Sequence, residues 1–138
     1  MKDDEKKNLT VLIDSWQDTT SGMRRVFLRL RDHLESKNPV RLAFKSRPGV
    51  SYSLRAATPG QGRELFVMVD VIDDDPQNRW LSVCFYGEMI TDPEEKGDLI
   101  PGGLLGEDGY CFDVQEDDDA LVTYLLDRID EAHQSALQ

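Results

Sequence analysis

The sequence lacks any apolar run long enough to span a membrane, and it has only two cysteines and two histidines in 138 residues. A membrane helix needs roughly 20 consecutive apolar residues, and the charged start of the chain has no apolar signal-peptide segment. We therefore expect a cytoplasmic protein without membrane association. The composition, 39% apolar and 31% charged, is typical of a folded chain, and the length predicts a single domain over residues 1–138.

The two cysteines, Cys84 and Cys111, are too few for a disulfide scaffold and lie among apolar residues in expected strands. Cysteines in such surroundings are usually buried thiols. A bridge between them is geometrically open if their strands are adjacent, but a reducing cytosol argues against it. We therefore expect two buried free thiols.

Motifs for metal, nucleotide or nucleophilic chemistry are also missing. His33 and His133 have no ligand spacing, and each is expected on a helix surface. The glycine-rich stretch 102–109 contains no basic residue and leads into a strand, which does not suit phosphate binding. The acidic clusters lack the spacing of an EF-hand loop, and no G-x-S-x-G motif is present. We expect no catalytic residue, no metal and no cofactor.

Charge is unevenly distributed within a formal net charge of −11. Residues 1–63 hold 13 Lys and Arg against 7 Asp and Glu, whereas residues 64–138 hold 3 against 20. A chain this acidic is a poor match for nucleic acid, which requires a concentrated basic surface. One interpretation of the asymmetry is a local basic patch formed by residues 1–63. The alternative is that the two halves lie together and partly neutralise each other.

The most regular segment is 64–87, where two apolar runs, 65–72 and 80–86, flank the turn-rich residues 73–78. This pattern predicts a β-hairpin near the centre of a sheet. One face of its first strand is wholly apolar, while the other face of the hairpin mixes polar with apolar residues: Phe66, Met68, Asp70, Trp80, Ser82 and Tyr86. A mixed face of this kind is expected where helices cover one side of a sheet and a loop, a groove or a second subunit covers the other.

Helices and a second hairpin are predicted around this segment. Alternating residues at 40–45 and 50–57, separated by a turn at 47–49, predict the second hairpin. Apolar spacing predicts helices over 9–16 and 23–34, although residues 9–13 alone would also fit a strand. Thr19, Thr20 or Ser21 is expected to cap the second of these helices.

The remaining segments complete the predicted fold. Residues 1–7 are expected to form a disordered tail, 88–109 a long loop and 110–114 a short strand, followed by a helix that the aspartates at 117–119 cap. The order of elements predicts an α+β fold. Its architecture is a two-layer sandwich, an antiparallel sheet of about five strands with the N- and C-terminal helices packed on one face.

A candidate site follows if the two hairpins share one sheet. Cationic, hydroxyl and aromatic side chains would then form a groove for an anion or an acidic peptide. The alternative is an ordinary outer face with solvated cations. The residues assigned to this site are Arg41, Lys45, Ser51, Ser53, Arg55, Asp70, Trp80 and Tyr86.

The absence of catalytic motifs and the charge asymmetry favour a non-enzymatic binding or adaptor module that acts through a protein partner or a homodimer. One alternative is a regulatory domain that binds a small anionic ligand or a nucleotide in the cationic and aromatic groove. An enzyme of unrecognised type is a further alternative. Fold analogy does not choose among them.

Overall fold

The computed structural model describes all of residues 1–138 as three helices and one six-stranded antiparallel sheet. The predicted α+β class, with helices from both ends of the chain, is confirmed, and the sheet has six strands instead of about five. The sheet order is β1-β2-β3-β4-β6-β5, so the predicted hairpin β3–β4 is central. The elements are α1 (Asp3–Ser15), α2 (Met23–Glu35), β1 (Arg41–Arg47), β2 (Ser51–Ala57), β3 (Val67–Ile72), β4 (Trp80–Tyr86), β5 (Asp98–Leu104), β6 (Glu107–Val114) and α3 (Asp119–Ala136).

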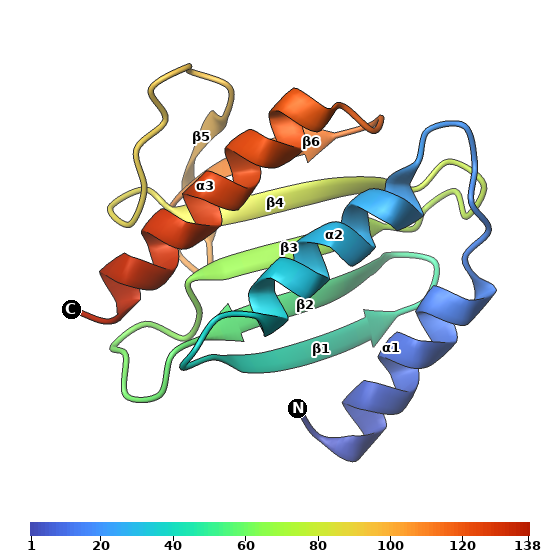
Figure 1. Cartoon of the computed structure of the whole chain (residues 1–138), viewed down its shortest axis with the longest axis horizontal. Coiled ribbons are helices and arrows are strands. Elements are labelled where there is room, and N and C mark those ends of the chain that lie inside the picture. The colour runs from blue at the N-terminus through green and yellow to red at the C-terminus, as the bar shows by residue number, and fades with distance from the viewer.

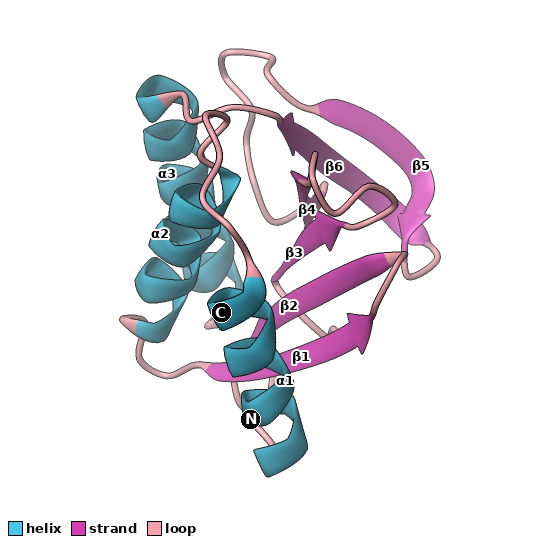
Figure 2. Cartoon of the chain, turned by 90° about the vertical axis from the view of Figure 1, so that its right-hand side faces the viewer, coloured by secondary structure: helices cyan, strands magenta, loops and turns pink.

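Helices α2 and α3 form one layer over a face of the sheet, which is the other layer, and α1 lies beside β1 (Figures 1 and 2). Alternation along each strand places one set of side chains against α2 and α3, because successive residues of a strand point to opposite faces. Strand register aligns these apolar residues across the sheet in rows. One such row, buried throughout, contains Phe44, Leu54, Val69, Val83 and Phe112. These apolar side chains form the core between the sheet and the helices. Their packing fixes the positions of the strands, and so of the side chains on the opposite face.

The first residues form a helix, so the expected disordered tail over 1–7 is wrong. Helix α1 begins at Asp3 and lies beside the edge strand β1 (Figure 1). Asp3, Asp4 and Glu5 occupy its first turn, where carboxylates favour the helix dipole. The Glu5 carboxylate also accepts a hydrogen bond from the Phe44 N–H at 2.7 Å. Helix α1 therefore covers part of one edge of the sheet.

The expected long loop over 88–109 is also wrong, because it contains β5 and the first residues of β6. Pro101 and the glycines at 102 and 103 interrupt the alternation of apolar and polar residues by which a strand is predicted from sequence. The strand forms at the outer edge of the sheet, where proline is tolerated, and its pairing with β6 is irregular between Ile100 and Leu104. Figure 2 shows β5 at the end of the sheet opposite to β1.

Two local predictions about helices need correction. Helix α2 is preceded by Gly22 with a φ of +75°, and neither threonine nor serine before it caps the helix. A Cβ at this position would lie 2.5 Å from the Arg25 guanidinium and 2.8 Å from Asp117, so only glycine fits.

His133, which was expected on a helix surface, is buried in α3, where its Nε2 lies 2.9 Å from the Pro39 carbonyl oxygen. The predicted cap of α3 is confirmed, since the Asp118 carboxylate accepts from the N–H groups of residues 120 and 121.

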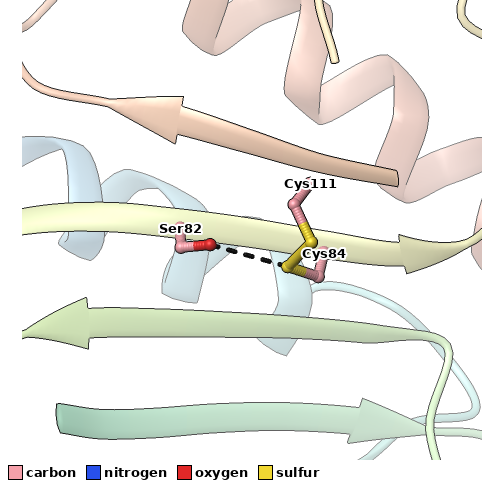
Figure 3. Close-up of a disulfide and its surroundings, with 3 residues drawn as sticks. All are labelled: Ser82, Cys84 and Cys111. Atoms are coloured by element: carbon pink, nitrogen blue, oxygen red, sulfur yellow. Dashed lines mark hydrogen bonds between the residues drawn. A yellow bond between two sulfur atoms is a disulfide. The ribbon is translucent and has the colours of Figure 1, made fainter. Parts of the chain in front are cut away.

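The cysteines form a disulfide between β4 and β6, which overturns the expectation of free thiols (Figure 3). Cys84 and Cys111 are directly opposed in the register of these two strands, with Cα atoms 4.2 Å apart. The earlier expectation depended on a reducing cytosol, whereas disulfides are typical of oxidising compartments. The cytoplasmic location thus stays a prediction. None of the helices combines the length and the apolar character needed to cross a membrane.

Candidate functional site

The open face of the sheet, defined as the side chains that point away from α2 and α3, collects the polar residues of the strands. Register aligns them in rows, as on the buried face. The central row runs across five adjacent strands and contains Lys45, Ser53, Asp70, Ser82 and Asp113. Charge thus changes sign across the sheet, from a cation on β1 to a carboxylate on β6.

All eight residues that the sequence assigned to a site lie on this open face, as the strand register shows. Five of them come together around one hollow of about 550 Å³. These five are Lys45, Ser51, Ser53, Arg55 and Asp70. The volume is within the range of small-ligand sites, roughly 300–1,000 Å³.

Other residues of this hollow were missed by the sequence prediction. Arg47 also lines it, together with Met68 and, from the β5–β6 hairpin, Gly103 and Leu105. Arg47 was assigned to a turn, although it continues the alternation of Arg41 and Lys45 along β1 and could have been found from that signal. The contribution of the β5–β6 hairpin depends on the path of a strand that the sequence pattern does not reveal.

Four cations on the open face of β1 and β2 define what we call the cationic strip: Arg41, Lys45, Arg47 and Arg55. None of them lies within 4.0 Å of a carboxylate, whereas all seven other arginines make such an ion pair. The only polar contact of a strip side chain is from Arg55 Nε to the Ser53 hydroxyl at 3.1 Å. In a protein with 27 Asp and Glu, this segregation leaves a local positive surface.

A second hollow, of about 740 Å³, extends the concave surface along the strip. Its charged lining includes Arg41, Glu5 from α1, and Arg63 and Glu64 from the loop after β2, and cations outnumber carboxylates by five to two. Lys45 and Arg55 line both this hollow and the one around Asp70. The two hollows therefore adjoin each other at Lys45 and Arg55.

Asp70 is the only acidic group lining the 550 Å³ hollow. Its Oδ1 atom is buried without a hydrogen-bond partner. Burial raises the pKa of Asp70 above its usual value, although the Ser53 hydroxyl, Arg55 and Arg47 act to lower it. A charged Asp70 therefore weakens both the folded state and the positive potential of the strip.

Asp70→Asn is expected to raise the free energy of unfolding by about 1 kcal/mol at neutral pH, because it removes a largely buried charge for which the nearby Ser53, Arg55 and Arg47 do not fully compensate. A carboxyl whose pKa is raised by folding destabilises the fold when ionised, and the penalty disappears as pH falls through the raised value. The gain over the wild type should therefore shrink on acidification. Urea unfolding of both proteins across a pH series measures it, with Asp113→Asn, an exposed carboxylate in the same row, as the control.

The two aromatic residues do not join the strip. Tyr86 is 2% exposed, with the Arg63 guanidinium 4.9 Å from its ring centroid. Trp80 pairs with Ile72 at the opposite end of β4. Neither ring lines the two hollows along the strip, so the groove is cationic and polar, without an aromatic wall.

No group of three or more His, Cys, Asp or Glu side chains is arranged to hold a metal ion. Comparisons of the chain with known protein families, with curated proteins and with solved structures found no match.

Proposed function

We propose that this protein is a non-enzymatic binding module whose cationic strip holds an acidic segment of a partner protein. The observation that carries the proposal is the segregation of the unpaired arginines. Arg41, Arg47 and Arg55 share one face of one hairpin, while every other arginine is paired with a carboxylate. Unpaired guanidinium groups on an acidic protein are available to carboxylates of a partner, for which their fork of donors is well suited.

The edges of the sheet support binding on its face rather than strand addition. Strand addition needs an exposed edge with free backbone groups. At β1 the Phe44 N–H already donates a hydrogen bond to the Glu5 carboxylate. At the other edge, β5 contains Pro101, and its pairing with β6 is irregular. Both devices are ways in which proteins block edge-to-edge pairing.

The shape of the surface favours an extended acidic segment over a single small anion. The two hollows along the strip adjoin each other, since Lys45 and Arg55 line both. From residue 41 to 47, β1 covers about 20 Å at roughly 3.3 Å per residue. A small anionic ligand in the hollow around Asp70 is the second candidate, favoured by the convergence of Lys45, Arg47 and Arg55 there.

The test is the affinity of a fluorescently labelled hexaglutamate peptide, measured by anisotropy. Arg41→Gln/Arg55→Gln is expected to weaken binding about tenfold, because each lost contact contributes up to about 1 kcal/mol at an exposed site. Arg25→Gln/Arg29→Gln, which removes the same charge from α2, is the matched control and should bind within about twofold of the wild type. Equal weakening by both variants would contradict the proposal and indicate nonspecific attraction. Inorganic phosphate as a competitor, displacing the peptide at low concentration, would favour the small-anion alternative.

A further inference from the structure

An apolar hollow of about 500 Å³ lies between α1, α2 and the start of β1. Its apolar lining comes from Leu9 and Ile13 of α1, from Val40 just before β1 and from Leu42 near its beginning, together with Met1. Thr10 also lines it from the exposed side of α1. The hollow is thus a concave apolar surface beside the edge strand.

The charges around this hollow are predominantly positive. Lys6 and Arg41 line it and have no carboxylate within ion-pair distance. Its other two charged residues, Arg31 and Glu35, pair with each other at 3.8 Å. The uncompensated charge at the rim therefore attracts an anionic occupant.

The apolar hollow is continuous with the cationic strip. Arg41 and Leu42, with Met1, line both this hollow and the 740 Å³ hollow on the strip. Arg41 is thus the residue at which the apolar and the cationic surfaces meet. A chain lying along the strip reaches the apolar hollow at the Arg41 end, beside the N-terminal part of α1.

We propose that the apolar hollow takes an aliphatic side chain of the same acidic segment that the cationic strip holds. The inference rests on the proposed function, and it names the partner's chemistry: an extended run of carboxylates with a leucine-like residue at one end. The strip supplies the attraction for the carboxylates, while removal of the aliphatic side chain from water supplies affinity that charge alone does not.

Four labelled peptides test this inference on the unmodified protein: Leu followed by six Glu, six Glu followed by Leu, and the two corresponding peptides with Ser in place of Leu. One of the two Leu peptides is expected to bind at least about tenfold more tightly than its Ser counterpart, as burial of a leucine side chain implies. The position of the effective Leu also gives the direction of the bound segment. Equal affinities of the Leu and Ser peptides would overturn the inference.

Two variants then locate the leucine. Thr10→Phe fills the hollow from an exposed helix position and is expected to abolish the gain from Leu while leaving the Ser peptides unaffected. Val11→Phe is the matched control, because Val11 is 58% exposed and does not line the hollow. Thermal melting checks that both variants are folded. A Leu gain that survives in Thr10→Phe overturns the inference. Failure of the Ser peptides to respond to the strip variants instead overturns the proposed function, so the two failures are distinguishable.

Discussion

Asp73→Asn is expected to lower the free energy of unfolding by about 3 kcal/mol, because it leaves the Arg79 guanidinium, whose side chain is 10% exposed, without a compensating charge. Asp73 is 2% exposed, and its carboxylate accepts from Arg79 Nε at 2.7 Å and from the Gly49 N–H at 2.8 Å. Arg79 also lies over the rings of Trp16 and Tyr52, at 5.4 and 5.6 Å. The pair thus joins the β1–β2 turn, the β3–β4 turn and the end of α1.

Equilibrium unfolding in urea measures this loss, and a double-mutant cycle with Arg79→Met separates the pair from its surroundings. The double variant is expected to be less destabilised than the sum of the single variants, because it removes both charges together. Asp74→Asn, an exposed carboxylate in the same turn, is the control and should change stability by less than about 0.5 kcal/mol. A similar loss in the control would mean that the turn, rather than the ion pair, determines the effect.

The same pair makes stability depend on pH. Burial acts to raise the pKa of Asp73, but the Gly49 N–H, Arg79 and Tyr52 outweigh it and hold this pKa below its usual value. A carboxyl with a lowered pKa in the folded state stabilises the fold above its unfolded pKa of about 3.9, and that contribution is lost as pH falls through the folded value. Wild-type stability should therefore fall more steeply in acid than that of Asp73→Asn.

The central hairpin was predictable because its period of two and its turn residues are local signals. Contacts distant in sequence explain the elements that were missed. The first turns of α1 carry no apolar stripe, but Glu5 binds the N–H of a residue 39 positions away. Strand β5 contains proline and two glycines, so its strand character comes from pairing with β6 rather than from its own residues.

The candidate site divides in the same way. Alternation within β1 to β4, together with the pairing of β2 with β3, places all eight predicted residues on one face, because register preserves the face across neighbouring strands. The absence of ion pairs along the cationic strip could not be predicted in this way, since it depends on where the 27 acidic residues lie in space. The approach of Gly103 and Leu105 to the strip, and the burial of Tyr86 under Arg63, also depend on the packing of segments that are distant in sequence.

Reduction of the Cys84–Cys111 disulfide is expected to lower the free energy of unfolding by about 3 kcal/mol. The bridge closes a loop with a sequence separation of 27, and a cross-link of this span limits the conformational freedom of the unfolded chain by about that amount. Unfolding of the wild type with and without dithiothreitol measures the difference, and Cys84→Ala/Cys111→Ala should be insensitive to the reductant. Titration of two thiols in the denatured but unreduced protein would contradict the bridge.

The effect of reduction on the cationic strip should be small, which separates a structural role of the disulfide from a functional one. Arg55, Met68, Cys84 and Cys111 form one row of the open face, so the bridge lies on the same surface as the strip. The ladder between β4 and β6 nevertheless has six register pairs, and it holds β6 in place after the bridge is broken. Reduced, folded protein is therefore expected to bind hexaglutamate within about twofold of the oxidised form. A tenfold change would instead show that the β5–β6 hairpin moves on reduction, because its residues Gly103 and Leu105 line the hollow that the strip shares.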